Sequence, residues 1–127
     1  LRGYIAANKI LSLPIRDLTH IERVWMAKVV YHRYVGMKEK KQIEKSILNL
    51  LTEEQKASSF AVGLGLRFIY IFCGGYPKNL EKIKLKIKKN KLICKIKPEA
   101  KSLMDKEVER RLKNFANASN LNYEIIF

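Results

Sequence analysis

The stretch that decides the fold is Leu18–Lys40, LTHIERVWMAKVVYHRYVGMKEK. Thr19 and Glu22 stand three residues apart, which is the spacing of a capping box at a helix start. At 100° per residue the polar side chains that follow scatter around the helix, and a helix that is apolar on most sides is usually buried. Gly36 then supplies a left-handed stop. We predict the central helix of an all-α unit, with neighbours packed on several sides.

Helical spacing also predicts elements on both sides of this helix. Apolar residues in Gly3–Leu11 repeat as in the tail of a helix, and Ser12–Asp17 is a connector because it contains a proline. Lys38–Leu51 is charged early and apolar late, which predicts a short amphipathic helix.

A long helix is predicted from Thr52 to about Cys73. Thr52 and Gln55 form a second capping-box pattern. Gly63 and Gly65 in its middle each cost about 1 kcal/mol of helix stability relative to alanine. We interpret them as places where a neighbouring helix comes close. Gly74-Gly75-Tyr76-Pro77 ends this helix and marks the boundary of the helical part.

Beyond this boundary the hydrophobic period changes from 3.6 to 2. Apolar residues alternate with lysines on both sides of Lys89-Asn90, which predicts a β-hairpin with one apolar and one lysine-rich face. A helix is predicted over Ser102–Ala118, and Tyr123, Ile125 and Phe127 form a third strand. The residues expected to face this helix are Ile83, Leu85, Ile87, Leu92, Cys94 and Ile96. The fold class is therefore α+β, with a helical bundle followed by a small β-β-α-β unit.

The net charge of +14 is the strongest feature of the composition. Such a surface attracts polyanions such as nucleic acid, anionic membranes or polyphosphate. The alternative is a compositional bias, because 19 of the 26 basic residues are lysine and an AT-rich genome gives the same excess. Two cysteines in apolar surroundings indicate reduced core thiols and a cytoplasmic protein. We expect no membrane segment, and the first residue, Leu1, indicates a piece of a longer protein.

The sequence contains no pattern for catalysis or metal binding. It lacks a glycine-rich phosphate loop, zinc-ligand spacing, a nucleophile elbow and a carboxylate cluster for magnesium. His20 and His32 are twelve residues apart on one helix, about 18 Å along its axis, and cannot share a metal ion. Catalytic and metal-binding residues are therefore predicted to be absent.

Arg67 is the single charge in the apolar stretch Phe60–Cys73. A buried arginine requires a carboxylate, carbonyl groups or a bound anion. Two interpretations stay open: an ion pair with an acid such as Glu22, or a contact with phosphate. The lysines of the hairpin also have two interpretations, a solvated face or a polyanion surface, although the interleaved aromatic residues of single-strand-binding surfaces are missing.

The sequence resembles the C-terminal region of the bacterial exopolyphosphatase / guanosine pentaphosphate phosphohydrolase family. The resemblance lies in segments that occur in the order of that family and together cover nearly the whole chain. These segments are Leu1-Arg2-Gly3, Leu18-Thr19-His20 with Arg23, His32 to Glu39, Leu64 to Tyr70, and Val108 to Leu112.

The resemblance implies an HD-like helical domain over residues 1–75, truncated at its N-terminus, and a small α/β unit over residues 78–127. It implies a separate N-terminal actin-like catalytic domain that uses magnesium, while this fragment itself holds no cofactor. The family's C-terminal region helps bind polyphosphate and supports a homodimer.

We therefore expect a polyphosphate-binding and dimerisation module whose parent enzyme hydrolyses phosphoric anhydrides. The alternative is a free-standing basic nucleic-acid-binding or adaptor protein. The preference for polyphosphate or guanosine pentaphosphate would be decided in the catalytic domain. The positions expected to face phosphate are Arg2, Arg23, Arg33, Arg67, Lys84 and Lys86.

Overall fold

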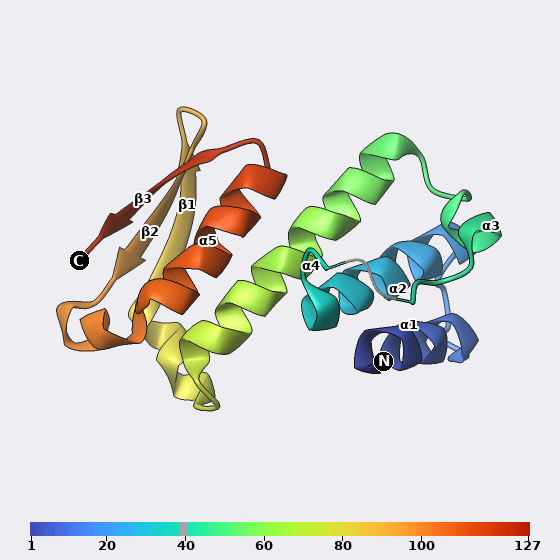
Figure 1. The fold of residues 1–127 in the computed structure, drawn as a ribbon, viewed down its shortest axis with the longest axis horizontal. Helices are drawn as coiled ribbons and strands as arrows, with labels where there is room; N and C mark the ends of the chain where they lie inside the picture. The colour runs from blue at the N-terminus through green and yellow to red at the C-terminus, as the bar shows by residue number, and fades with distance from the viewer. Residues whose placement is uncertain (39–40) are drawn as a thin grey trace. The chain divides into compact units, whose positions relative to one another are not determined.

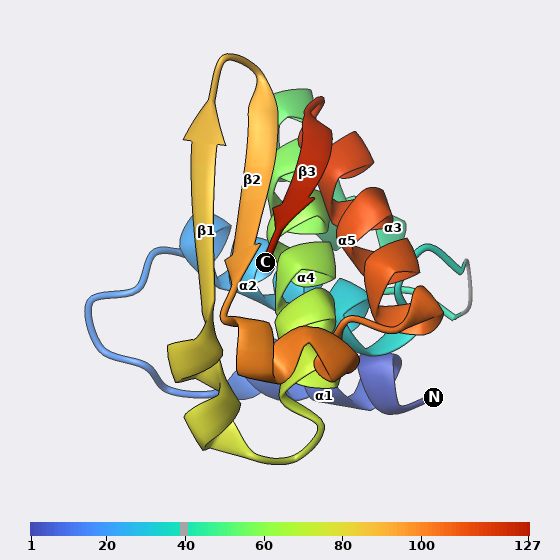
Figure 2. The same ribbon diagram turned by 90° about the vertical axis from the view of Figure 1, so that its left-hand side faces the viewer.

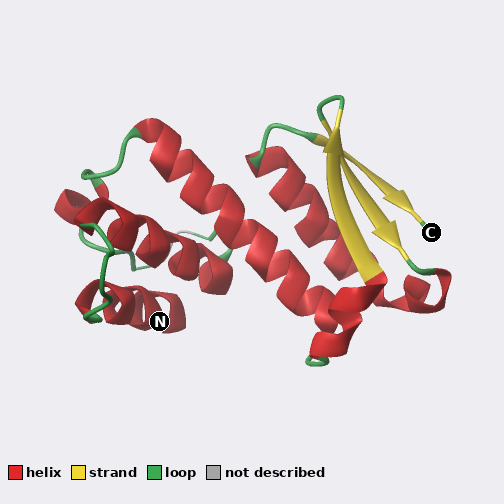
Figure 3. Ribbon diagram, turned by 180° about the vertical axis from the view of Figure 1, so that it is seen from behind, coloured by secondary structure: helices red, strands yellow, loops and turns green. Residues whose placement is uncertain are grey.

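The computed structural model describes residues 1–38 and 41–127, and the chain divides into two compact units, Leu1–Leu64 and Gly65–Phe127. The elements are α1 (Arg2–Ser12), α2 (His20–Val35), α3 (Lys45–Leu48), α4 (Glu53–Cys73), the 3-10 helix η1 (Pro77–Lys82), β1 (Ile83–Lys88), β2 (Lys91–Ile96), the 3-10 helix η2 (Pro98–Leu103), α5 (Lys106–Ala118) and β3 (Asn122–Ile126) (Figure 1). The described strands β1, β2 and β3 belong to the second unit. Figure 3 shows them in yellow as one small sheet beside helices, so the predicted α+β class is confirmed.

The capping box at the start of α2 is present. The Thr19 hydroxyl accepts from the Glu22 amide at 3.1 Å, and the Glu22 carboxylate accepts from the Thr19 amide at 3.3 Å. The helix ends at Gly36, whose φ of 66° is positive as expected, although its ψ of −131° lies outside the left-handed helical region. Local sequence therefore sets both ends of α2.

Helix α2 is the central helix of the first unit, as predicted. A Cβ on Gly3 of α1 would lie 2.8 Å from the Val35 side chain, so the α1 backbone closely approaches α2. On the α4 side, the Trp25 indole donates to Ser58 at 2.8 Å. Buried residues shared by α1, α2 and the segment before α3 form the core of this unit: Ala7, Ala27, Tyr31, Val35 and Ile43.

The prediction of a helix over Lys38–Leu51 is wrong in extent, because only Lys45–Leu48 is α-helical. Glu39 and Lys40 lie outside the described residues. No side chain caps the helix start at Glu44. Ile43 and Leu51 are buried on either side of this single helical turn. These two buried side chains fix the position of the segment, so the longer amphipathic helix that was predicted does not form.

Helix α4 begins and ends as predicted. The amide of Thr52 donates to the Gln55 side chain at 2.9 Å, and the Thr52 hydroxyl accepts from the Gln55 amide at 3.1 Å. Gly74 and Gly75 follow the helix with φ values of 57° and 89°. The change of secondary structure therefore lies at the predicted residues, while the division into compact units falls within α4, between residues 64 and 65. The domain division at residues 75 and 78 stays a prediction.

Among the described residues, α4 is the helix that is long and apolar enough to cross a membrane by length and composition. Helices in the core of soluble proteins pass the same test, and Phe68 and Phe72 of α4 are almost completely buried. The composition of α4 is therefore weak evidence for a membrane, and the expected absence of a membrane partner stays a prediction.

The sheet has the order β1-β2-β3 (Figure 2). Strands β1 and β2 are antiparallel and joined by Lys89 and Asn90, whose φ values of 51° and 58° are those of a two-residue hairpin turn. Strand β3 runs parallel to β2, so α5 is the crossover of a β-α-β unit. The hairpin was predicted, whereas the parallel direction of β3 was not.

The second core confirms the predicted register but not the predicted burial. Ile83, Leu92, Cys94 and Ile96 are buried in one cluster with α5 residues. Leu85 and Ile87 pair with Cys94 and Leu92, so they lie on the same sheet face, yet their side chains are 40% and 67% exposed. The expectation that all six apolar residues pack against the helix is therefore wrong for Leu85 and Ile87, which lie on the edge strand β1 beyond its one buried residue, Ile83.

The last helix begins later than predicted, at Lys106. Asp105 caps it, because its carboxylate accepts from the Val108 amide at 2.9 Å. The preceding segment, Pro98–Leu103, forms a 3-10 helix, with proline at its start. Leu103 contacts the core from outside the α-helix, which explains why its spacing resembled that of a helical residue.

Candidate polyanion-binding site

The lysines of the hairpin lie on the outer face of β1 and β2. Lys84 pairs with Lys95 across the two strands, and the Lys97 amide donates to the Lys82 carbonyl at 2.9 Å, which extends the same register by one step. Directly opposite side chains are about 5 Å apart and alternate residues of a strand about 7 Å apart. The backbone positions of these four lysines therefore form the corners of a small rectangle. Like charges placed directly opposite destabilise a sheet, so a bound anion would relieve this arrangement.

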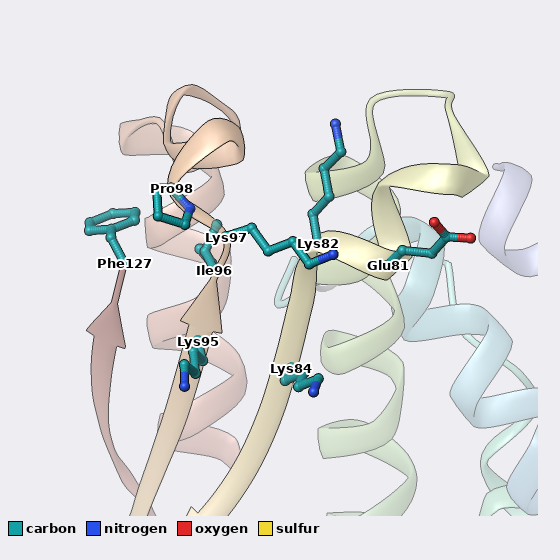
Figure 4. A pocket seen from close by; sticks show the side chains of 8 residues that line it. All are labelled: Glu81, Lys82, Lys84, Lys95, Ile96, Lys97, Pro98 and Phe127. Atoms are coloured by element: carbon teal, nitrogen blue, oxygen red, sulfur yellow. The ribbon is translucent and has the colours of Figure 1, made fainter.

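These four lysines border a pocket of about 390 Å³ at one end of the hairpin. Its lining residues come from η1, from both hairpin strands, from the segment after β2 and from the residue after β3: Glu81, Lys82, Lys84, Lys95, Ile96, Lys97, Pro98 and Phe127. The volume is within the range of small-ligand sites. Figure 4 shows the Lys97 side chain extending toward β1, and the Glu81 carboxylate pointing away from the lysines.

The pocket also has an apolar side. Phe127 and Pro98 lie next to each other there (Figure 4), and Phe127 is 47% exposed. The Lys101 ammonium lies 5.0 Å from the centre of the Phe127 ring, so a fifth lysine is close to this edge. The pocket therefore offers an aromatic surface beside a group of cations.

Four lysines line the pocket together with one carboxylate, that of Glu81. In the described part of the chain none of the four lysines forms an ion pair. Other basic residues of this unit do: Lys91 lies 3.7 Å from Glu124, and Arg110 and Arg111 share Glu107. These arginines lower the pKa of Glu107 to about 2 through their hydrogen bonds. Uncompensated cations around a hollow attract anions.

The six predicted phosphate-facing residues are divided between the two compact units. Lys84 lines the pocket, whereas Lys86 lies on the same strand outside its lining. Arg67 is partly buried on α4 and does not line the pocket. The other three, Arg2, Arg23 and Arg33, belong to the first compact unit.

Two of these arginines have structural contacts. The Arg23 guanidinium donates to the Leu13 carbonyl and, at 3.4 Å, to the Ile10 carbonyl, which satisfies groups at the C-terminal end of α1. The Arg33 guanidinium lies 4.3 Å from the centre of the Tyr34 ring. Arg2 is exposed at the start of α1. Phosphate contacts of these residues stay predictions.

A partly buried polar cluster in the first unit is formed by Lys28, His32 and the Lys56 carbonyl group, and the sequence alone does not predict it. The Lys28 ammonium lies 3.0 Å from Nε2 of His32 and 3.2 Å from the Lys56 carbonyl oxygen, while Nδ1 of His32 lies 3.1 Å from the Gly36 carbonyl. Burial and the nearby Lys28 charge lower the pKa of His32 to about 4. Burial and Lys56 lower the pKa of Lys28 to about 8. His32 is therefore neutral at pH 7, donates through Nδ1 and accepts from Lys28.

This cluster predicts a loss of stability at mildly acidic pH. The pKa of His32 is lower in the folded chain, about 4, than its ordinary value of 6.5, so the unfolded chain binds the extra proton as the pH falls from 6.5 to 4. By pH 5 the free energy of unfolding should fall by on the order of 2 kcal/mol. The measurement is urea unfolding at pH 7 and pH 5, followed by the fluorescence of Trp25.

The control for this prediction is His32→Gln, which removes the titrating ring. This variant should lose much less stability than the wild type between pH 7 and pH 5. An equal loss in both proteins would show that other groups cause the acid effect. Glu107 does not interfere, because the low pKa of its carboxyl keeps it charged throughout this range.

The described residues contain no group of three His, Cys, Asp or Glu side chains that could hold a metal ion. Cys73 and Cys94 are free and buried, as expected for core thiols. Burial raises the pKa of Cys94 to about 11, so its thiol stays protonated at neutral pH and is a poor nucleophile.

The helical unit, the three-stranded sheet and the lysine-lined pocket define a class of basic α+β module that presents a cationic surface. The chain belongs to the family described as Exopolyphosphatase, C-terminal, whose model matches residues 1–126. This match confirms the resemblance seen in the sequence and identifies the chain as the C-terminal module of an exopolyphosphatase. No curated protein matches the sequence.

Proposed function

We propose that this module binds the polyphosphate substrate of the parent exopolyphosphatase, and that the lysine-lined pocket is the binding site. The observation that carries this proposal is the group of Lys82, Lys84, Lys95 and Lys97, none of which forms an ion pair in the described part of the chain. Polyphosphate carries negative charge along its whole length, so one chain can contact all four ammonium groups at once. Binding would hold a long substrate near a separate catalytic site.

Other parts of the proposal extend what the family resemblance implies. The parent would have an N-terminal actin-like domain that uses magnesium to remove terminal phosphates from polyphosphate or guanosine pentaphosphate, and it would act in the cytoplasm. This module would also support a homodimer. Sedimentation equilibrium tests the dimer, because a species near 14.8 kDa at all concentrations would contradict self-association of the module.

The test of the pocket is a titration with polyphosphate of Lys84→Gln and Lys86→Gln. The two lysines lie two residues apart on β1, are both exposed and carry the same charge, but only Lys84 lines the pocket. At 0.1 M salt, loss of one phosphate contact should weaken binding about fivefold and reduce the salt slope by about 0.7–0.9. Lys86→Gln should have a smaller effect on both quantities. Equal effects of the two substitutions would argue against the pocket as the site.

A second candidate function is binding of single-stranded nucleic acid, and the observation that favours it is Phe127. Its ring is nearly half exposed at the pocket, and a base stacked on an aromatic side chain contributes about 1–3 kcal/mol. Phe127 follows β3 and lies outside the hairpin, and it would supply an aromatic contact beside the pocket lysines.

The same titration separates the two functions when single-stranded DNA replaces polyphosphate at matched ionic strength. Phe127→Ala should weaken DNA binding, and leave polyphosphate binding unchanged, only if bases stack on the ring. The matched control is Tyr76→Ala, which removes another highly exposed aromatic residue outside the pocket. Stronger binding of DNA than of polyphosphate at equal charge would favour the nucleic-acid function.

A further inference from the structure

One edge of the sheet has no partner strand. In the order β1-β2-β3, β1 pairs with β2 on one side, and no backbone hydrogen bond beyond the sheet involves residues 83–88 in the described part of the chain. Figure 2 shows this strand at the border of the sheet. The free N–H and C=O groups of such an edge are a template for another extended chain.

The apolar face of the sheet continues to this edge without cover. Leu85 and Ile87 of β1 are 40% and 67% exposed, whereas their partners Cys94 and Leu92 on β2 are almost completely buried. Two large apolar side chains are therefore exposed next to a row of unpaired backbone groups. An added strand would cover them with every second one of its side chains.

The charge of β1 restricts which strand fits. Lys84, Lys86 and Lys88 alternate with the apolar residues and are exposed on the opposite face. A second copy of this chain pairing through β1 would bring lysines against lysines, which is destabilising and is a common way to protect sheet edges from self-association. A strand that pairs with this edge should therefore carry acidic residues opposite the lysines.

We propose that β1 accepts a fourth strand from a partner segment in which acidic and apolar residues alternate. The apolar residues would lie beside Leu85 and Ile87, the acidic residues would face the lysines, and the backbone would pair with the free edge. This mode of recognition takes its affinity from main-chain hydrogen bonds and its specificity from alternate side chains.

The test uses two fluorescent eight-residue peptides made of four glutamates and four valines. In one the two residue types alternate, and in the other the glutamates form one block, so charge and composition are equal. The alternating peptide should bind the full 127-residue chain at least tenfold more tightly than the block peptide does. It should also slow hydrogen exchange of the β1 amides.

Ile87→Lys should reduce binding of the alternating peptide at least tenfold, whereas the control Ile126→Lys, at an exposed position on β3, should not. Equal affinity for the two peptides would overturn the proposal. Binding of the alternating peptide without slower hydrogen exchange of the β1 amides would also overturn it. Both results are obtained with the wild-type chain, so they do not depend on how any variant folds. Polyphosphate binding should be retained in Ile87→Lys, so failure of this inference is distinguishable from failure of the polyphosphate site.

Discussion

Gly63→Leu should lower the free energy of unfolding of the first unit by about 3 kcal/mol, the upper end of the range for overpacked sites. A Cβ on Gly63 would lie 2.7 Å from Cβ of His32 and 2.8 Å from the Val29 carbonyl oxygen. The second of these atoms belongs to the backbone of α2 and cannot rotate away. The gain of about 1 kcal/mol in helix propensity on replacing glycine is therefore outweighed.

Gly63→Ala and Gly65→Ala provide the comparison. A Cβ on Gly65 would lie 2.9 Å from the Phe115 ring, which is a side chain that can shift, so this substitution should cost less than Gly63→Ala. Urea unfolding measures both. Fluorescence of Trp25 reports on the first unit and circular dichroism on the whole chain. If Gly63→Ala instead stabilised the protein by about 1 kcal/mol, helix propensity alone would explain the result. The close approach of α4 to α2 at Gly63 would then be contradicted.

Features that depend on residues within four positions of each other were predictable from the sequence. The capping boxes at Thr19 and Thr52 have the expected hydrogen bonds, because both partners of each box lie in one helical turn. The turn at Lys89-Asn90 was found because the period-2 pattern on both sides left two residues to connect the strands. The close approach at Gly63 was also predicted, although the sequence could not name α2 as the neighbour.

Features that depend on distant parts of the chain were not predictable in the same way. Alternation placed Leu85 and Ile87 on the correct face, but strand order decides whether a helix covers that face. The parallel direction of β3 also depends on how α5 crosses the sheet. The start of the last helix is different, because it depends on a local cap signal, Asp105, that is readable from the sequence.

The candidate site was predictable only in part. The lysine-rich face follows directly from the alternating pattern, and Lys84 was among the expected phosphate-facing residues. The pocket itself requires Pro98 and Phe127, which are 29 residues apart in the sequence and are brought beside the lysines by the parallel third strand. Arg67 was predicted from its place in an apolar stretch, and Arg2, Arg23 and Arg33 were proposed with the family resemblance. The Arg23 guanidinium donates to the Leu13 carbonyl, and the phosphate contacts of all four arginines stay predictions.

Reversing the charge of Lys82, Lys84, Lys95 and Lys97 together, by substitution with glutamate, should weaken polyphosphate binding roughly a thousandfold or more at 0.1 M salt. Each lost phosphate contact removes about 0.7–0.9 from the slope of log affinity against log salt concentration, so four contacts remove about 3. The side chains are exposed or nearly so on the outer face, away from the buried core cluster, so the sheet should stay folded. Circular dichroism checks this.

The decisive control changes the net charge by the same amount elsewhere. Glutamate at four exposed lysines outside the pocket, Lys9, Lys45, Lys106 and Lys113, also lowers the net charge from +14 to about +6, because each reversal changes the charge by two. If the pocket is the site, this control should lose far less affinity and keep most of the salt slope. If both variants lose the same affinity and the same slope, the overall charge of the protein attracts polyphosphate without a defined site. In that case the lysine hairpin is a solvated face, which was the other interpretation of its sequence.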